Sequence, residues 1–570
     1  MKYVFSGAFV VMALCSVVAL TWTPRPTDPR AEGLDFFLTR VGQSEIKPIV
    51  TWEGAEALFH NLDASGDGVL SKEDRIPAAG TGLDSLSFLL DAADDDGDGR
   101  VCRSELRAFF TYLDRNRDGV LTLEDRPEAP PIELIWCSDD NPVRREQIRL
   151  FNRYHSDYRL RLDPHNAGMD KIIVQSLAGV GPDLFDCYTG YQLSAYVRAG
   201  VALDLTDALQ ESNHSSAEVW PSLHPLILHE DRVYGAINNA GAQAVWYNKR
   251  IFDEAGLPYP AGDWTWDDCI DICRALTVRN ARGQITRYGL IGFWDWKLGL
   301  FQHGADFFTP EGTRCTLDSP EAAAAMQFMQ DLIYTHEVMP TPQAEAAIAS
   351  AGGWGTGVIT LFGAERGAMA IGGRWWLCIL RDPSYAHLDL GAVEIPALRL
   401  PDGRLSRRNY GYGRSTLINA AGPNVEGALL FIRFLFSPEW SALINRQADA
   451  LGPVVRYNYT DDFMFNPAFP AEDFNAVWRS AMETTEAEQV SPYINGQTVD
   501  RILWKQTDLV RANQKSGADA MRDAARRINE EIIETLARDA RLREKYYEAL
   551  ARGAEPAWEP GARLPWGAAP

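Results

Sequence analysis

The pattern of apolar and polar residues changes character several times along the chain. Residues 3–22 form one apolar run without a charged side chain, about long enough to cross a bilayer. From residue 132 onward, short apolar or alternating runs are interleaved with stretches of helical periodicity. Strands that alternate with helices in this way are typical of an α/β fold with a parallel sheet. We therefore expect a globular α/β body behind an apolar N-terminal helix.

The first strands of this body also predict where a ligand would bind. Residues 132–136 and Tyr158–Leu162 read as strands, Met169–Ala178 reads as a helix, and Pro182–Phe185 begins the next strand. Ligands of open α/β sheets bind at the carboxyl ends of the strands. Those ends are predicted at residues 137–141 and 186–189.

The last ordered element is predicted to be an amphipathic helix over Ala518–Ala537. Its apolar stripe has helical spacing and consists of Met521, Ala525, Ile528, Ile532 and Leu536. Residues 541–570 are expected to be a helical end followed by a tail. Beyond Gly553 the tail is rich in Pro, Gly and Ala, which predicts disorder.

Three acidic stretches each match the twelve-residue calcium loop of the EF-hand: 63–74, 94–105 and 114–125. Oxygen-bearing side chains stand at positions 1, 3 and 5, Gly at position 6, an apolar residue at 8 and a carboxylate at 12. With the backbone carbonyl at position 7, the expected metal ligands are Asp63, Ser65, Asp67, Val69, Asp74, Asp94, Asp96, Asp98, Arg100, Glu105, Asp114, Asn116, Asp118, Val120 and Asp125.

These loops predict a small all-α EF-hand module over residues 50–130 that binds up to three Ca²⁺ ions. An acidic solvated linker is the alternative, which three loops with aligned Gly and aligned apolar residues disfavour. Asp74 and Asp125 are one methylene shorter than the usual Glu, so loops one and three are expected to bind calcium more weakly, or to accept magnesium. No Met-rich helix face accompanies the loops, which favours a spacer over a target-binding sensor.

The N-terminal run is predicted to place the rest of the chain outside the cytoplasm. Residues 1–22 fit a signal-anchor or a signal peptide; we favour the uncleaved anchor because no small-x-small cleavage site follows. Residues 23–49, rich in Pro and charge, are expected to be a tether. The predicted location is periplasmic or extracytoplasmic, attached to the cytoplasmic membrane by residues 3–22.

Length, charge and cysteines narrow the class of protein. A chain of 570 residues predicts several domains. The net charge of −23 argues against a nucleic-acid partner. Eight scattered cysteines without a CxxC motif predict buried thiols rather than a zinc site or a disulfide framework.

Four segments, together with Asp263–Asp268 (D-W-T-W-D-D), resemble one known family. The segments are Y-G-A-I-N-N-A-G-A-Q-A-V-W-Y-N-K-R-I-F-D-E-A-G-L-P-Y-P (234–260), L-A-G-V-G-P-D-L-F (177–185), F-T-P-E-G-T-R-C-T-L-D-S-P-E-A-A-A-A-M (308–326) and A-M-A-I-G-G-R-W-W (368–376). In this order they look like the extracellular solute-binding proteins of carbohydrate ABC transporters, family 1, of the maltose-binding-protein type. The resemblance covers about residues 132–540.

The resemblance implies a two-lobed periplasmic-binding-protein fold, type II-like, that closes on a ligand between its lobes. Lobe 1 would comprise about 132–239 and 415–451, and lobe 2 about 240–413 and 452–539. It implies a monomeric receptor, not an enzyme, that delivers an oligosaccharide, sugar or sugar phosphate to ABC permease subunits. The family usually lacks EF-hands ahead of the first lobe, so the calcium module is a departure from its pattern.

Sugar sites combine flat aromatic side chains with planar hydrogen-bonding groups. Tyr188 and Trp375 stand where the family places aromatic platforms. Arg374 could contact the ligand or brace the hinge, and Asn239 could be a ligand contact or a turn residue. The expected ligand-binding residues are Asp139, Asn141, Asp186, Tyr188, Asn239, Trp294, Asp295, Trp296, Arg374, Trp375, Tyr410 and Tyr412, whereas Trp246, Tyr247 and Trp376 are expected in the core.

Two other functions remain as alternatives. A calcium-dependent adhesion or polysaccharide-binding protein of the cell surface would use a shallow groove instead of a closing cleft. A glycoside-active enzyme would need a pair of carboxylates, and acidic residues are abundant. The sequence contains no G-x-S-x-G, H-E-x-x-H or P-loop motif, and no GxGxxG motif after a strand, which favours a binding protein.

Overall fold

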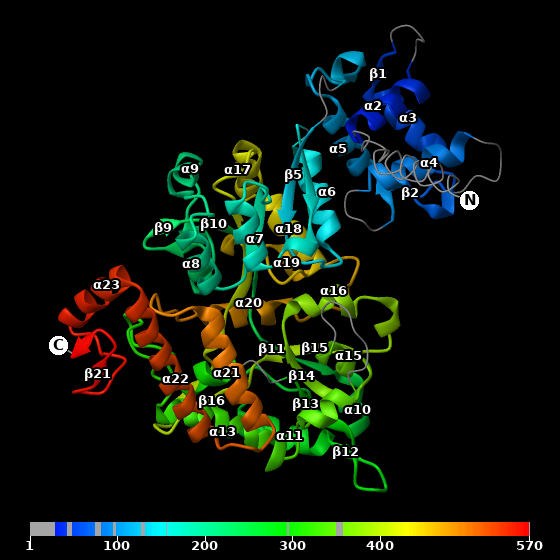
Figure 1. Ribbon diagram of the computed structural model, residues 1–570. Helices are drawn as coiled ribbons and strands as arrows, with labels where there is room; N and C mark the ends of the chain where they lie inside the picture. The colour runs from blue at the N-terminus through cyan, green and yellow to red at the C-terminus, as the bar shows by residue number, and fades with distance from the viewer. Residues whose placement is uncertain are drawn as a thin grey trace, which may run out of the picture. The chain divides into compact units, whose positions relative to one another are not determined.

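The computed structural model describes residues 29–42, 48–74, 81–94, 99–126, 131–155, 157–292, 296–348 and 357–568 (Figure 1). The chain divides into two compact units, one formed by Met1–Glu133 with Ile148–Leu160 and the other by Leu134–Gln147 with Arg161–Pro570. The apolar run of residues 3–22 lies outside the described residues.

In the described part of the chain, no single helix is long and apolar enough to cross a bilayer. Helices α17 (Val425–Phe434) and α18 (Pro438–Gln447) would meet the length and composition criteria only as a pair bent by 65°.

The first unit contains the three acidic loops. Its elements are α2 (Pro29–Arg40), β1 (Val50–Thr51), α3 (Trp52–Leu62), β2 (Val69–Leu70), α4 (Thr81–Ala92), β3 (Val101–Cys102), α5 (Arg103–Leu113) and β4 (Val120–Leu121), with 3-10 turns at Lys72–Asp74 and Leu123–Asp125. The apolar residues at loop position 8, Leu70, Val101 and Leu121, are fully buried in its core, as the sequence predicts. Helix α5 leaves the second loop and enters the third, so it serves both.

The loops are held in pairs by short antiparallel strands. Strand β2 pairs with β3, which sets Leu70 of the first loop opposite Val101 of the second. Strand β4 of the third loop pairs instead with β1, which sets Leu121 opposite Val50. Val50 therefore occupies the place of a position-8 residue in a loop that the sequence pattern does not reveal.

The segment α2–β1–α3 is a fourth hand that lacks the carboxylate of position 12. In the three acidic loops the carboxylate at position 12 accepts a hydrogen bond from the backbone N–H of position 9, as Asp125 does from Thr122 at 2.8 Å. In the fourth hand, counted with Val50 as position 8, position 12 is Gly54, which has no side-chain oxygen. Residues 29–40, expected to belong to a tether, are helical because Leu34 and Phe37 pack into the core of this unit.

The lobes are built on two five-stranded sheets, one in each lobe (Figure 1). The sheet of lobe 1 has the order β10 (Gly235–Gly241), β19 (Tyr412–Ile418), β7 (Leu184–Cys187), β5 (Ile132–Cys137) and β6 (Tyr158–Leu162). The sheet of lobe 2 has the order β12 (Val278–Arg279), β13 (Ile285–Ile291), β14 (Gly367–Gly372), β11 (Ala244–Asn248) and β15 (Leu390–Glu394). Both are mixed sheets, because β5 is parallel to β7 and β13 to β14, while β19 and β11 run antiparallel to their neighbours.

The remaining elements cover these sheets. Those of lobe 1 are α6 (Arg144–Tyr154), α7 (Met169–Leu177), α8 (Gly190–Arg198), α9 (Thr206–Glu211), α17, α18 and the hairpin of β8 (Leu228–His229) and β9 (Arg232–Val233). Those of lobe 2 are α10 (Lys249–Ala255), α11 (Trp266–Leu276), α12 (Trp296–His303), α13 (Pro320–Tyr334), α14 (Pro342–Ile348), α15 (Val358–Gly363), α16 (Leu377–Leu380), α19 (Asp461–Met464), α20 (Asn475–Glu483), α21 (Gly496–Arg511), α22 (Gly517–Arg538), and the strand pairs β16 (Leu398–Arg399) with β17 (Leu405–Ser406) and β18 (Asn409–Tyr410) with β20 (Thr485–Glu486).

The chain crosses between the lobes where one sheet's strand ends and the other's begins. Strand β10 in lobe 1 ends at Gly241, and β11 in lobe 2 begins at Ala244. The return crossing passes through Gly411, which separates β18 from β19. A Cβ atom at Gly411 would lie 2.6 Å from the Ser222 hydroxyl, so glycine lets the chain pass closely here.

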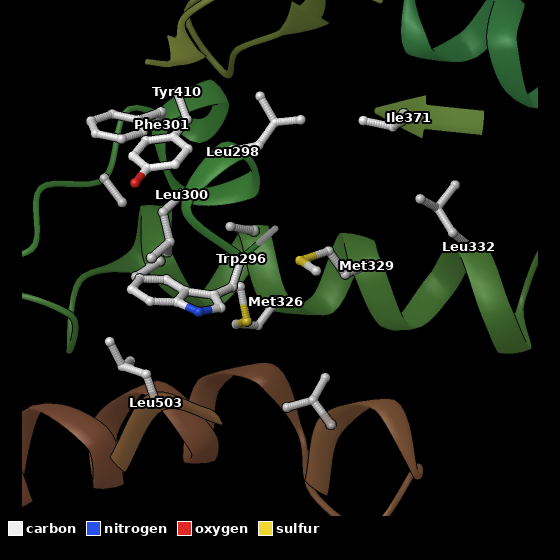
Figure 2. Close-up of a cluster of buried hydrophobic side chains, with 14 of the residues drawn as sticks. Trp296, Leu298, Leu300, Phe301, Met326, Met329, Leu332, Ile371, Tyr410 and Leu503 are labelled. Carbon is white, nitrogen blue, oxygen red and sulfur yellow. The ribbon is translucent and has the colours of Figure 1, made fainter. Parts of the chain in front are cut away.

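The core of lobe 2 is formed by helices that are far apart in the sequence and pack against one another. Figure 2 shows Trp296, Leu298 and Phe301 of α12 together with Met326 and Met329 of α13. Leu503 of α21 lies below α13 in this view. The predicted stripe 521–536 lies on α22 and is fully buried, which confirms the amphipathic interpretation.

The C-terminal residues differ from the expected disordered tail. Helix α23 (Ala540–Ala551) is followed by the short strands β21 (Arg563–Leu564) and β22 (Gly567–Ala568). Trp558 and Trp566 pack against the core of lobe 2, and Trp566 donates a hydrogen bond to the Tyr547 hydroxyl at 2.7 Å. Two large aromatic side chains thus order a segment whose Pro and Gly content alone predicts disorder.

The described cysteines are free thiols. Cys137, Cys187 and Cys315 are buried, and burial raises the pKa of each thiol to about 12. Cys269 and Cys273 lie on α11 with sulfurs 3.9 Å apart, without a bond between them. These thiols behave as small core residues, as the sequence predicts.

Candidate functional site

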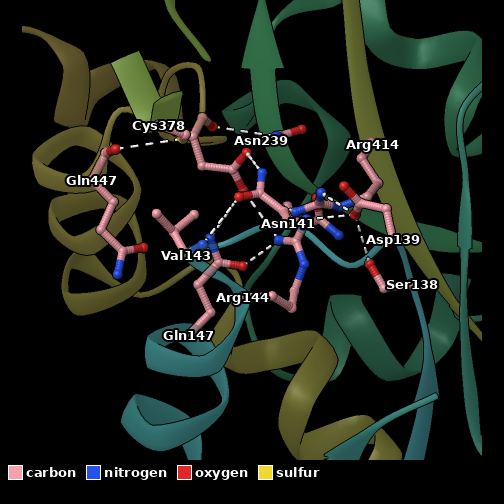
Figure 3. A network of polar contacts seen from close by, with 12 residues as sticks. Ser138, Asp139, Asn141, Val143, Arg144, Gln147, Asn239, Cys378, Arg414 and Gln447 are labelled. Carbon is pink, nitrogen blue, oxygen red and sulfur yellow. Dashed lines mark hydrogen bonds and ion pairs between the residues drawn. The ribbon is translucent and has the colours of Figure 1, made fainter. Parts of the chain in front are cut away.

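The carboxyl ends of the lobe-1 strands carry a network of buried charges (Figure 3). Asp139, just after β5, accepts hydrogen bonds from Arg144 at 2.6 Å and from Arg414 of β19 at 3.1 Å. Both guanidinium groups also reach Asp449, at 3.1 and 3.2 Å. Residues far apart in sequence meet here because β5, β7, β10 and β19 are neighbours in one sheet.

Asp186 at the end of β7 forms the floor of this network. Its carboxylate is 3% exposed and accepts hydrogen bonds from the Trp136 indole at 2.8 Å and the Thr416 hydroxyl at 2.7 Å. Arg414 pairs with it at 3.1 Å. These contacts hold the buried Asp186 carboxylate beneath Asp139 and Arg414.

Burial and ion pairing act against each other in the network. Burial tends to raise the pKa of Asp139 and of Asp449, but the guanidinium groups of Arg144 and Arg414 outweigh it and hold both pKa values below the ordinary range. For Asp186 burial prevails over the same two arginines, and its pKa is raised. Three carboxylates share two guanidinium groups, which leaves the edge with a formal charge of −1.

Tyr188 is the residue of this edge that offers an open aromatic face. Its side chain is 38% exposed, and its hydroxyl lies 3.4 Å from Asp139. Asn141 and Asn239 are buried, and each donates a hydrogen bond to Asp449, to its carboxylate and its backbone carbonyl respectively. The structure thus brings five predicted residues together: Asp139, Asn141, Asp186, Tyr188 and Asn239.

Lobe 2 contains a pocket of about 500 Å³ whose lining is rich in aromatic side chains. Three of the predicted residues, Trp296, Trp375 and Tyr410, line it. It also includes residues that the sequence interpretation missed or assigned to the core: Gln243, Lys297, Trp376, Asp500 and Trp504. Asp500 and Trp504 stand four residues apart on α21, so their side chains share one face of that helix.

Lys297 is the cation of the pocket and is held in place on several sides. It forms an ion pair with Glu488 and lies 3.2 Å from the Tyr410 hydroxyl. Its ammonium group is also 4.8 Å from the centre of the Tyr410 ring, within cation–π range. Glu488 in turn accepts a hydrogen bond at 3.4 Å from the backbone N–H of Gly190 in lobe 1.

Four predicted residues lie elsewhere or outside the described part. Arg374 is 1% exposed and donates to the backbone carbonyls of Ala450 at 2.7 Å and Asn445 at 2.8 Å, so it braces the lobes. Tyr412 donates to the Ala242 carbonyl at 3.3 Å, at the interlobe crossing. Trp294 and Asp295 are outside the described residues.

The acidic loops of the first unit have the backbone of EF-hands. Gly68, Gly99 and Gly119 at position 6 have φ values of 82°, 79° and 86°, a left-handed conformation that favours glycine. Asp63 at position 1 accepts hydrogen bonds from Gly66 and Gly68 of its own loop, at 2.8 and 2.9 Å. The donor set is hard oxygen throughout, which suits Ca²⁺.

Some of the expected metal ligands are gathered differently, or lie outside the described residues. In the part of the chain that the structure describes, no group of three or more His, Cys, Asp or Glu side chains is gathered around a common point. Asp96 and Asp98 lie outside the described residues. Asp74 instead bonds the backbone N–H groups of Ser65 and Ser71, at 2.9 and 2.7 Å.

Comparison with known proteins gives relatives for both units. The family model described as bacterial extracellular solute-binding protein matches residues 141–442, and an EF-hand model matches residues 89–110. An arabinooligosaccharide-binding protein of Halalkalibacterium halodurans is 33% identical over 113 residues, which is 20% of this chain and a quarter, 25%, of that protein. A binding protein of Brucella abortus is 23% identical over 405 residues, covering 67% of this chain and 93% of the relative.

Solved structures share the fold of the second unit. An ABC substrate-binding protein from Listeria monocytogenes in complex with cycloalternan aligns with a TM-score of 0.59 at 18% identity, over 70% of this chain and 98% of its own. Maltose-bound MalE3 of T. maritima aligns with a TM-score of 0.56 at 18% identity, over 70% of this chain and 99% of its own. UgpB from Mycobacterium tuberculosis, in complex with glycerophosphocholine, aligns with a TM-score of 0.57 at 18% identity, over 71% of this chain and 99% of its own.

These findings agree with the two sheets, the crossings between the lobes and the polar strand ends. The likeness to the solved structures establishes a two-lobed, MalE-like fold. The family model spans more than half of the 570 residues. The chain belongs to the bacterial extracellular solute-binding protein family.

Proposed function

We propose that this protein captures a carbohydrate outside the cytoplasm and delivers it to the permease subunits of an ABC importer. The observation that carries the proposal is the aromatic pocket of lobe 2, lined by Trp296, Trp375 and Trp504. Flat aromatic faces bind the C–H faces of sugar rings, and nearby polar groups bind the hydroxyls. Several of the relatives are named or solved as sugar-binding proteins, which supports the same ligand class.

The polar edge of lobe 1 is proposed as the second wall of the ligand site. Asp139 keeps part of its side chain exposed, 24%, and Tyr188 offers an open ring beside it. The ion pairs with Arg144 and Arg414 fix the Asp139 carboxylate in one orientation. A fixed acceptor loses little entropy when it binds a sugar hydroxyl.

Closure of the lobes is the proposed event that the permease detects. The chain crosses between the lobes at residues 242–243 and 411, and rotation about these crossings would bring the two walls together. A ligand that contacts both walls binds the closed form better and shifts the equilibrium toward it. Arg374 keeps the lobes attached on the side of residues 445–450.

A binding role accounts for the acidic residues better than glycoside hydrolysis does. Catalysis by paired carboxylates needs one acid with a raised pKa and one ionised partner, both open to the substrate. The raised acid of the lobe-1 edge, Asp186, is buried and bonded to Trp136 and Thr416. The relatives found by comparison are binding proteins as well.

The EF-hand unit is proposed to bind up to three calcium ions and to act as a spacer. Its ligands would be the oxygen atoms of loops 63–74, 94–105 and 114–125. We further propose that residues 3–22 tether the protein to the cytoplasmic membrane; in the sequence the EF-hand unit follows this segment and precedes most of the two lobes. Calcium would then stiffen the connection rather than adjust sugar affinity.

The test combines ligand binding with a measure of closure. The full-length protein is screened by thermal shift against neutral oligosaccharides, and small-angle scattering is recorded with and without each ligand that raises the melting temperature. A binding oligosaccharide that reduces the radius of gyration supports the proposal. Binding without any change in radius would favour the adhesion alternative, and no binding by any sugar would overturn the carbohydrate assignment.

A further inference from the structure

Asp500 is a carboxylate without a partner in the pocket of lobe 2. It lies on α21 and lines the pocket together with Trp375, Trp504 and Tyr410. No hydrogen bond or ion pair joins its side chain to any other residue in the described part of the chain, whereas Asp139, Asp186 and Asp449 are each held by arginines. An unpaired carboxylate beside aromatic walls is available to a ligand.

The cations near the site have their donor groups engaged by other residues of the protein. Lys297, the only cation among the described pocket-lining residues, is paired with Glu488. Arg374 gives its guanidinium to Asn475 and to two backbone carbonyls. Beside the pocket, two carboxylates, Asp500 and Glu488, thus stand near the single ammonium of Lys297, while Arg374 is not among the lining residues. At the lobe-1 edge three carboxylates share two guanidinium groups, those of Arg144 and Arg414.

This charge pattern discriminates between ligands. A phosphate or carboxylate group would lose its hydration in the closed cleft and meet Asp500 without a free cation to compensate it. A protonated amine would gain an ion pair with Asp500 and cation–π contacts with the indole rings of Trp375 and Trp504. A neutral sugar would use Asp500 only as a hydrogen-bond acceptor.

Burial raises the pKa of Asp500; the nearby ammonium of Lys297 opposes this shift, and Glu488 adds to it. Keeping the Asp500 carboxylate ionised in the pocket therefore costs free energy. A cationic ligand would relieve that cost.

We propose that the pocket of lobe 2 selects saccharides without negative charge, that it favours an amine-bearing sugar unit, and that Asp500 is the residue that makes this selection. This inference rests on the proposed carbohydrate-binding function and narrows its ligand class. It excludes the sugar phosphates that the family resemblance leaves open.

The test uses sugars that differ only in charge. The full-length protein is titrated calorimetrically at pH 7 with mono-, di- and trisaccharides of gluco and galacto configuration, each as the hexose, the hexosamine and the hexuronate. Within the series that binds, the hexosamine is expected to bind about fivefold to tenfold more tightly than the hexose, and the hexuronate weaker by a similar factor.

Two variants of α21 isolate the contribution of Asp500. Asp500→Asn should bring the affinity for the hexosamine down to that for the hexose and should remove most of the loss of affinity for the hexuronate. The affinity for the hexose itself should change least. Asp508→Asn removes the same charge from an exposed position of the same helix, and should leave the order of affinities for the hexosamine, hexose and hexuronate unchanged. If Asp500→Asn does not fold, the wild-type protein still provides a test, because raising the salt from 0.05 to 0.5 M should narrow the differences between charged and neutral sugars.

The two levels of the proposal fail in different ways. Hexuronates or sugar phosphates that bind as tightly as the neutral sugars, or an Asp500→Asn variant with an unchanged order of affinities, would overturn the charge selection and leave carbohydrate binding intact. No binding by any sugar would overturn the proposed function, and this inference with it.

Discussion

The ammonium nitrogen of Lys297 lies 3.2 Å from the phenol oxygen of Tyr410. Lys297 comes from α12 and Tyr410 from β18, next to the return crossing between the lobes. Through its ion pair with Glu488, the same cation also contacts the segment after β20. One lysine therefore joins three separate segments around the pocket of lobe 2, and the shape of the pocket depends on it.

Replacing Lys297 by Met should destabilise the protein because Glu488 would remain buried without a counter-charge. Loss of one partner of a buried pair costs about 3–5 kcal/mol, and we expect the lower end here because both side chains keep some exposure. The measurement is the free energy of unfolding in urea.

The matched control is the double variant K297M/E488Q, which removes both charges. It should recover at least half of the stability lost in K297M. Equal losses in the single and double variants would show that the pair contributes little and that packing of the lysine stem dominates.

Truncation of the neighbouring residues Trp375 and Trp376 should affect different properties: mainly sugar affinity for Trp375 and mainly folding stability for Trp376. Trp375 lines the pocket and is partly exposed, so Trp375→Ala should weaken sugar binding by about tenfold or more with a small loss of stability. Trp376 is 4% exposed, so Trp376→Ala should cost about 3–5 kcal/mol of stability. Calorimetric titration and urea unfolding of both variants measure the two effects; an affinity that Trp375→Ala leaves unchanged would remove that ring from the site.

Stability should fall at acid pH through the charge network of lobe 1. The pKa values of Asp139 and Asp449 are lower in the folded protein than the ordinary value of about 3.9, so their stabilising contribution is present above that pH and is lost as the pH falls through the folded values. The pKa of Asp186 is raised in the folded protein, so its contribution to stability changes in the opposite direction: it decreases as the pH rises above about 4.

Unfolding free energies between about pH 2.5 and pH 6 for the wild type and for Asp449→Asn test this dependence. The variant should be less stable near pH 6 and should show a shallower decline below about pH 4. An unchanged decline in the variant would place the acid sensitivity outside the network.

Calcium removal should loosen the first unit and leave sugar affinity nearly unchanged. Chelation is expected to increase amide hydrogen exchange over residues 50–126, because the loop oxygens would lose the calcium ion that they bind in common. Since β4 pairs with β1, Asp114→Asn should raise amide hydrogen exchange in the fourth hand, α2–β1–α3, whereas Asp63→Asn should raise it in β3. A large effect of calcium on sugar affinity would contradict the spacer role.

Local patterns predict much of the fold because each depends on residues close in sequence. The alternation of strands and helices after residue 132, the buried stripe of α22 and the apolar position 8 of the acidic loops are all of this kind. The polar strand ends follow from the rule that ligands lie at the carboxyl edge of a sheet, and that edge does collect Asp139, Asp186 and Asn239.

What the sequence does not reveal depends on contacts between distant segments. Asp500 of α21 lines the same pocket as Lys297 of α12, about two hundred residues away in sequence. Arg374 is drawn into the core by carbonyl groups near residue 450. The fourth hand has Gly54 where the other loops have a carboxylate, so the pairing of β1 with β4 is what identifies it.

Carbohydrate capture by closure of the lobes is the central claim, and small-angle scattering of the full-length protein with and without a saturating oligosaccharide tests it most directly. We expect a smaller radius of gyration with the sugar, because a ligand that contacts both walls stabilises the closed form. The decrease should disappear in Trp375→Ala at the same sugar concentration. An unchanged radius in the presence of a bound oligosaccharide would contradict the account.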